Sequence, residues 1–199
     1  MPYNQFTIDS VGAALGVSIK DRTGLFVDIS PVTYSDFLKQ ALQEYSPVAL
    51  AIGTEKSRSE FIIAPILFEL KRQFGEQISL FSGREFNVDI AHGLTGYCDF
   101  LISQSSEQLF IQAPVITVVE AKNDNIKSGL GQCVAEMVAA QRFNQQRENL
   151  IPSVYGVITT GSIWQFLRLQ GMTVEIDLTE YFLNDVGKIL GILKHCVAG

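Results

Sequence analysis

Residues 114–122 read Pro-Val-Ile-Thr-Val-Val-Glu-Ala-Lys, an apolar run that ends in two opposite charges. The β-branched residues of this run favour a strand. Successive side chains of a strand point to opposite faces, so Glu120 and Lys122 project from one face while Val119 and Ala121 occupy the other. The run therefore predicts a carboxylate and an ammonium group side by side at the end of a strand.

A second β-rich run, residues 94–102, carries the lone acidic residue Asp99. The intervening residues 103–108 are polar enough for a turn or loop. We therefore expect the two strands to be antiparallel neighbours, an arrangement that would bring Asp99 beside Glu120.

Two carboxylates and a lysine held together are what metal-assisted hydrolysis of a phosphodiester requires. Mg²⁺ is a hard cation that takes one or two carboxylates together with substrate oxygens. The lysine can orient water or stabilise negative charge that develops on the phosphate. A simpler interpretation also fits the pattern, because an acidic residue and a lysine two positions apart at a strand end often form a solvated ion pair of little energetic value.

The order Asp, an intervening segment and then Glu-Ala-Lys resembles the PD-(D/E)XK nuclease superfamily, which includes many restriction and repair nucleases. In that resemblance Asp99 stands in the Asp position, Glu120 in the (D/E) position and Lys122 in the Lys position. Cys98 stands where the superfamily's name has a proline, which members often lack. The resemblance implies that these three residues are catalytic and that Asp99 and Glu120 bind a divalent metal, Mg²⁺ or Mn²⁺.

A helix expected at residues 54–74 adds a third acidic residue. Thr54 is a suitable N-cap, Gly75 follows the apolar run, and Pro65 is expected to kink the helix because it removes a backbone donor. Many members of the superfamily carry a glutamate on the helix before the sheet, directed at the metal site, and Glu60 matches that placement. The alternative is a glutamate on the exposed surface of the helix.

A second helix is expected at about residues 127–148, after the proposed site. Several members of the superfamily carry a glutamine in this helix, and Gln132 resembles it, which adds Gln132 to the catalytic residues. The alternative is a buried polar residue satisfied by the backbone. Glu136, one turn later, is interpreted as a buried polar residue. Gly129 and Gly131 in the opening turn predict a close backbone approach, either by a neighbouring strand or by a phosphate at the positive end of the helix.

The chain as a whole predicts an α/β (α+β) fold in a single domain, residues 1–199. The order helix, three or four strands and helix matches the αβββαβ core of the restriction endonuclease-like fold over about residues 55–170, with a mixed central sheet flanked by helices. A helical embellishment precedes this core, and strands and a helix follow it. The further elements expected are helices at residues 6–15, 37–42 and 185–197, and strands at residues 24–29, 78–82, 85–90, 154–160, 164–169 and 173–178.

The amino-acid composition is typical of a globular protein. Hydrophobic residues make up 47% of the chain and charged residues 18%. The sequence has neither an apolar run long enough to cross a membrane nor a signal-peptide pattern, so we expect a cytoplasmic protein without a membrane partner. Cys98, Cys133 and Cys196 lack metal or redox spacing and are expected to be buried reduced thiols. The net charge of -6 argues against broad nonspecific binding to nucleic acid, although acidic nucleases exist.

Two classes of function follow from these patterns. The first is a metal-dependent phosphodiesterase that hydrolyses DNA, with Lys122 orienting the attacking water. The second is a catalytically inactive protein of the same fold that binds nucleic acid or protein. The acidic charge and the lack of a recognisable DNA-reading domain favour the second class, whereas the full set of candidate ligands favours the first. Both classes are compatible with a homodimer.

Overall fold

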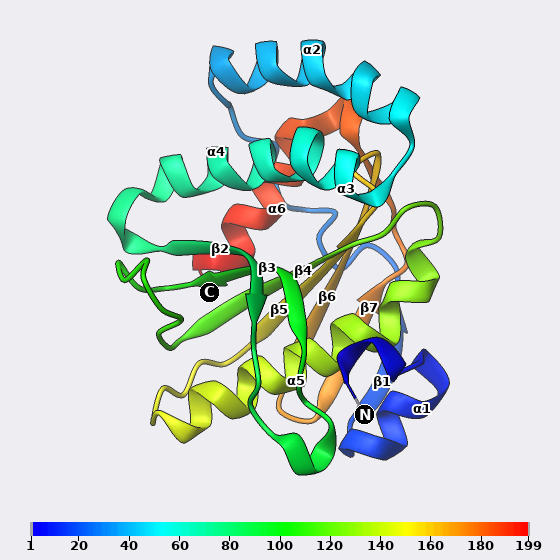
Figure 1. The fold of residues 1–199 in the computed structure, drawn as a ribbon, viewed down its shortest axis with the longest axis vertical. Helices are drawn as coiled ribbons and strands as arrows, with labels where there is room; N and C mark the ends of the chain where they lie inside the picture. Colours follow the sequence, from blue (N-terminus) through cyan, green and yellow to red (C-terminus); the bar gives the residue numbers. More distant parts are fainter. Residues whose placement is uncertain (1, 199) are drawn as a thin grey trace.

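The β-rich runs of the sequence form one mixed sheet in the computed structural model, which describes residues 2–198 (Figure 1). Within those residues the sheet has eight strands, in the order β1-β7-β6-β5-β4-β3-β2, with β8 paired to β6. The strands are β1 (Ser18–Arg22), β2 (Ser79–Glu85), β3 (Tyr97–Ser103), β4 (Val115–Ala121), β5 (Val154–Thr159), β6 (Ile163–Gln170), β7 (Thr173–Asp177) and β8 (Tyr181–Phe182). The predicted α+β class with a mixed central sheet is confirmed.

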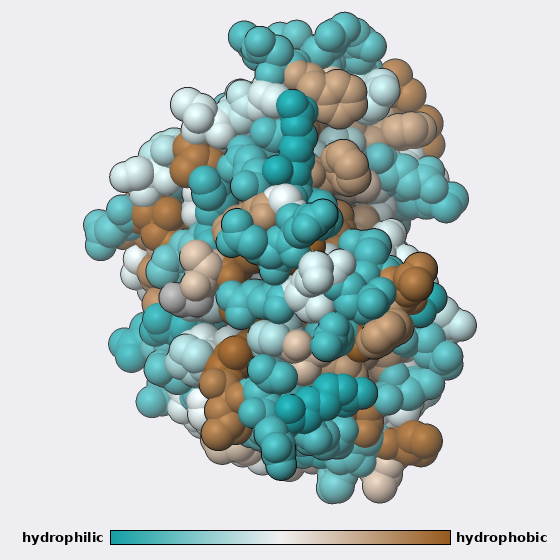
Figure 2. Space-filling model, turned by 90° about the vertical axis from the view of Figure 1, so that its left-hand side faces the viewer, coloured by the Kyte–Doolittle hydropathy of each residue, from teal (hydrophilic) through white to brown (hydrophobic). Residues whose placement is uncertain are grey.

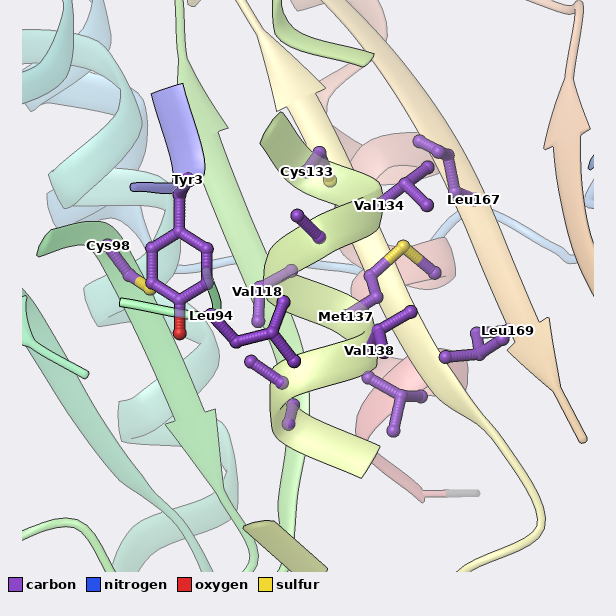
Figure 3. Packing of buried hydrophobic residues seen from close by; sticks show 14 of the residues in the cluster. Tyr3, Leu94, Cys98, Val118, Cys133, Val134, Met137, Val138, Leu167 and Leu169 are labelled. Carbon is purple, nitrogen blue, oxygen red and sulfur yellow. The ribbon is translucent and has the colours of Figure 1, made fainter. Parts of the chain in front are cut away.

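Helices cover both faces of this sheet (Figure 1). The α-helices are α1 (Ile8–Leu15), α2 (Asp36–Ile52), α3 (Glu55–Arg58), α4 (Ala64–Phe74), α5 (Leu130–Gln146) and α6 (Val186–Ala198). Helices α5 and α1 lie on one face, and α4 and α6 lie on the other beneath α2. The apolar side chains between α5 and the sheet include Val118, Val134, Met137, Val138, Leu167 and Leu169 (Figure 3).

The central strands β2 to β5 include both antiparallel and parallel pairs. Strand β3 is antiparallel to β2 and to β4, whereas β4 is parallel to β5. The parallel pair requires a crossover, and α5 provides it across one face of the sheet. The order along the chain is therefore helix, three strands, helix and strand.

The helix predicted before the sheet is present, but it is interrupted. Thr54 caps it by accepting a hydrogen bond from the Ser57 amide at 3.1 Å. Between α3 and α4 the turn Ser59–Ile63 is π-helical, and it ends two residues before Pro65. Proline cannot donate to the carbonyl four residues earlier, so a widened turn here is consistent with the disturbance expected at Pro65.

The prediction of a strand at residues 85–90 is wrong, because β2 ends at Glu85 and the chain leaves the sheet. The Asn87 side chain accepts a hydrogen bond from the Gly96 amide at 3.0 Å, and Asp89 accepts one from the His92 amide at 3.2 Å. Backbone hydrogen bonds also continue from Phe86 to Gly96 and from Val88 to Leu94, but the pairing is irregular and ends in an isolated bridge, so these residues form no regular strand. Three strands, and not four, separate the two helices of the predicted core.

The prediction of a strand at residues 24–29 is also wrong. The amides of Gly24 and Phe26 donate to the carboxylate of Asp177, at 3.0 and 3.3 Å, instead of to a neighbouring strand. The strand of this region is β1, which ends at Arg22 and pairs in parallel with β7. The segment has strand-like side chains, but a distant carboxylate fixes its backbone as turns.

The close approach predicted at the start of α5 is made by the N-terminal segment. A Cβ atom added to Gly131 would lie 2.4 Å from the carbonyl oxygen of Phe6 and 2.4 Å from the backbone of Thr7. At Gly129 the added Cβ would lie 3.0 Å from the Lys122 side chain. Packing of residues 6–7 therefore accounts for Gly131, and neither a strand nor a phosphate is needed there.

Two further expectations concern the surface and the cysteines. None of the helices within residues 2–198 is long and apolar enough to cross a membrane. Exposed apolar side chains are interspersed with polar ones on the face drawn in Figure 2. Cys98, Cys133 and Cys196 are buried and unpaired, as predicted.

Candidate functional site

The two charges at the end of β4 lie on the face of the sheet that α5 covers. Val118 belongs to the apolar cluster beneath α5, whereas Val119 and Ala121 belong to the cluster on the opposite face. Alternation along the strand therefore directs Glu120 and Lys122 toward α5. The two side chains share one face, as the sequence predicted. The Lys122 amide continues the pairing with β5 by donating to the Thr159 carbonyl at 2.8 Å.

Asp99 lies beside this strand end. The regular pairing of β3 with β4 reaches Phe100 and Val119. At the next position the Asp99 carboxylate, through Oδ2, accepts a hydrogen bond from the Ala121 amide at 2.8 Å. The expected antiparallel neighbours are thus present, and they bring Asp99 to the segment that carries Glu120.

A chain of contacts runs from Glu120 into α5. Lys122 Nζ forms an ion pair with Glu120 Oε1 and lies 3.4 Å from Gln132 Oε1. Gln132 Nε2 in turn donates to Glu136 Oε1 at 3.0 Å. The structure thus brings Glu120, Lys122 and Gln132 together, and it extends the group to Glu136.

Burial governs the protonation of the carboxylates. Burial, and then the negative charge of Asp99, raise the pKa of Glu120 to about 8, although Lys122 opposes the shift. Burial also raises the pKa of Asp99 against the opposing effects of the Ala121 amide and Lys122. The two carboxylates therefore lie where negative charge is costly even with the ammonium group of Lys122 nearby.

Lys122 remains a cation in this setting. Burial alone would lower its pKa, but the neighbouring Glu120 carboxylate outweighs burial, so the pKa of Lys122 lies above its ordinary value. An ammonium group donates hydrogen bonds and cannot accept a proton. The chemistry available to Lys122 is therefore to stabilise negative charge or to orient water, and not to act as a base.

Asp99 opens into a pocket of about 260 Å³, whereas Glu120 is only 2% exposed. The pocket is lined by Glu55, Lys56, Ser59, Glu60, Ser82, Gly83, Asp99 and Ala121. Glu60 faces this pocket from the π-helical turn, but its side chain is 52% exposed and forms an ion pair with Lys56 at 2.7 Å. Glu60 thus shares the pocket with Asp99 without contacting Glu120.

Within residues 2–198, no three His, Cys, Asp or Glu side chains are arranged as a ready metal site. Two carboxylates nevertheless suit Mg²⁺, which often takes one or two carboxylates and completes its shell with water and substrate oxygens. Glu120 Oε2 is buried and has no hydrogen-bond partner among the described residues. Asp99 and Glu120 therefore offer the type of donor that such a cation takes, and one oxygen of Glu120 is not engaged by the described residues.

Two acidic residues of this region were not predicted as site residues. Glu55 lines the pocket beside Asp99, and its charge raises the pKa of both Glu120 and Lys122. Glu136 is fully buried at the far end of the contact chain. The spacing of Glu136 four residues after Gln132 indicates that the two share a helix face, but Glu55 resembles any acidic residue in a first helical turn.

A larger pocket of about 410 Å³ adjoins the first. Both pockets include Glu60 and Ser82 in their lining. The larger pocket is mainly apolar, with aromatic side chains from Phe37, Tyr45, Phe68 and Phe100.

No protein-family model and no curated protein matches this chain.

Proposed function

We propose that this chain is a metal-dependent deoxyribonuclease of the PD-(D/E)XK type. The observation that carries the proposal is the strand-end group, in which two partly or fully buried carboxylates lie beside a lysine kept in its charged form. The order helix, three strands, helix and strand, with β4 parallel to β5, supports the resemblance to that superfamily.

Each residue would have a distinct role. Asp99 and Glu120 would hold Mg²⁺ or Mn²⁺, which when bound supplies Lewis-acid polarisation of a phosphoryl oxygen. Lys122 would donate hydrogen bonds to the attacking water or to the charge that develops on the phosphate. Gln132 would hold the ammonium group of Lys122 through its carbonyl oxygen. Glu60 would assist at the mouth of the pocket, directly or through water.

The test is cleavage of DNA by the purified protein in the presence of Mn²⁺. We expect wild type to cleave at least one of single-stranded, branched or duplex DNA. Lys122→Ala should be about a hundredfold slower or more, because it removes one positioned electrostatic contact with the transition state. Lys127→Ala is the matched control, since Lys127 is an exposed lysine five residues away, and its rate should equal that of wild type.

Metal binding gives an independent readout. Calorimetric titration with Mn²⁺ should show binding to wild type and to Lys122→Ala, and much weaker binding to Asp99→Ala. If a panel of DNA and RNA substrates shows no metal-dependent cleavage above that of Glu120→Ala, the nuclease proposal fails.

A catalytically inactive module is the second candidate, and the low exposure of Glu120 favours it. In that case Asp99→Ala would leave Mn²⁺ affinity unchanged, and Glu120 and Lys122 would be a buried ion pair that contributes to packing. Nucleic acid or protein binding without cleavage, unaffected by Lys122→Ala, would support this candidate.

A further inference from the structure

Glu136 is a fully buried acid in the middle of α5 with no role in the function proposed above. Its Oε1 accepts the hydrogen bond from Gln132, and its Oε2 has no hydrogen-bond partner among the described residues. An incompletely satisfied buried carboxyl destabilises a fold, and an apolar side chain of the same size would be easier to bury. Packing alone therefore does not explain an acid at this position.

The groups around Glu136 come from several elements. On the side of the proposed site they are Glu120, Asp99, Lys122 and Gln132, and burial followed by the charge of Glu120 raises the pKa of Glu136 well above its ordinary value. On the other sides the charge of Glu136 contributes, after burial, to raising the pKa of Tyr3, Cys98 and Cys133. Lys122 is the positive group of this set, and it is linked to Glu136 through Gln132.

The orientation of the Gln132 amide depends on this link. An amide has a donor end and an acceptor end, and only the acceptor end can face the ammonium group of Lys122 favourably. Glu136 Oε1 accepts from Gln132 Nε2 at 3.0 Å, so Gln132 Oε1 is left on the side of Lys122 Nζ, 3.4 Å away. Without an acceptor at residue 136, the Gln132 amide would lose its fixed orientation.

We infer that Glu136 is a positioning residue that fixes the Gln132 amide and thereby holds Lys122 in the proposed site. Its role as a positioning residue for catalysis rests on the proposed function, but the orientation of Gln132 can be measured whether or not the protein cleaves DNA. A carboxyl is needed here only as an acceptor, so glutamine should replace it and leucine should not.

The first measurement is the NMR signal of the Gln132 side-chain amide in metal-free protein, assigned by its loss in Gln132→Leu. We expect a slowly exchanging, shifted signal in wild type and in Glu136→Gln, and a signal close to that of free glutamine in Glu136→Leu. Met137→Leu, a buried substitution at the next position of α5, is the control for general disturbance of the helix and should leave the signal unchanged. Glu136→Met has a similar shape and replaces Glu136→Leu if the latter does not fold.

The second measurement separates the two proposals. If wild type cleaves DNA, Glu136→Leu should lower kcat about five- to tenfold with KM unchanged, the loss expected for one hydrogen bond, and Glu136→Gln should restore kcat. If wild type does not cleave but the amide signal responds as expected, the nuclease proposal fails and the positioning of Gln132 stands. An amide signal in Glu136→Leu identical to that of wild type overturns the inference, whatever the activity.

Discussion

Asp177 and Glu120 are both buried carboxylates near the ends of strands of the same sheet, but their surroundings differ. Asp177 Oδ1 accepts from the amides of Gly24 and Thr179, at 3.0 and 2.9 Å. Asp177 Oδ2 accepts from the Phe26 amide at 3.3 Å and from the Tyr181 hydroxyl at 3.0 Å. Glu120, by contrast, pairs one oxygen with Lys122 and has no partner for the other among residues 2–198.

The difference indicates a structural role for Asp177 and a different role for Glu120. Asp177 is saturated with donors from the segment at residues 24–26 and from the end of the sheet, so it organises the backbone of the protein itself. Glu120 is held in place but incompletely satisfied, an arrangement that costs stability and that a bound ion or a catalytic role would explain. The comparison predicts opposite responses to substitution.

The largest effect is expected at Asp177. Asp177→Ala should lower the free energy of unfolding by about 3–5 kcal/mol, because it leaves several buried donors without an acceptor. Urea denaturation followed by circular dichroism measures the change. Asp177→Asn keeps one acceptor oxygen, so its free energy of unfolding should fall by less than that of Asp177→Ala. A decrease below about 1 kcal/mol for Asp177→Ala would contradict the structural role of Asp177.

Glu120→Gln should behave differently in metal-free protein. Its free energy of unfolding at neutral pH should stay within about 1 kcal/mol of wild type or increase, because the neutral amide resembles the mainly protonated carboxyl expected below a pKa of about 8 and keeps an acceptor for Lys122. The same denaturation experiment, with a chelator present, tests this. A loss as large as that of Asp177→Ala would make Glu120 a structural carboxylate.

The response to pH sharpens the contrast. Glu120 has an ordinary pKa of 4.5 that rises to about 8 in the folded protein, so between these values the folded state keeps a proton that the unfolded state releases. Stability contributed by this group therefore falls as the pH rises through that window. The free energy of unfolding of wild type minus that of Glu120→Gln should decrease from pH 5 toward about pH 8 in chelator. A difference that is constant or increases with pH would contradict the raised pKa.

The smallest effect is expected at Glu175, in β7, which lies next to the edge strand β1. The hydrogen bond from Arg168, with help from Arg22, holds the pKa of Glu175 below its ordinary value. Its contribution to stability is present above the ordinary pKa and is lost as the pH falls through the folded value, the reverse of Glu120. Glu175→Gln should cost about 0.5–1 kcal/mol at neutral pH, and the difference from wild type should vanish in acid. Thermal denaturation across an acidic pH series measures this difference.

The sequence predicted the positions of the candidate site residues better than it predicted the structural role of Asp177. Glu120, Lys122 and Asp99 could be placed because strand alternation and strand pairing are local or nearly local rules. Asp177 could not, because its partners Gly24 and Phe26 lie more than 150 residues away in the sequence. The same distant contacts turned residues 24–29, which have strand-like side chains, into turns.

The contacts within the site were predictable to different degrees. The face shared by Gln132 and Glu136 follows from helical spacing, so their contact could be anticipated. The fully buried position of Glu136 depends also on the N-terminal segment that packs against the start of α5, and no local pattern indicates that packing. The interruption of the helix before the sheet could be anticipated from Pro65, but not its form as a π-helical turn.

The pairing of β1 with β7 has a consequence for how the protein is made. Ser18 pairs with Thr173 and Arg22 with Asp177. This edge of the sheet therefore cannot form during translation until residues 173–177 have left the ribosome. Loop closure over such a distance is slow compared with the formation of helices or hairpins. Strand β1 is therefore synthesised long before its partner β7, and until β7 is available its backbone donors and acceptors are open to chaperones or to other nascent chains.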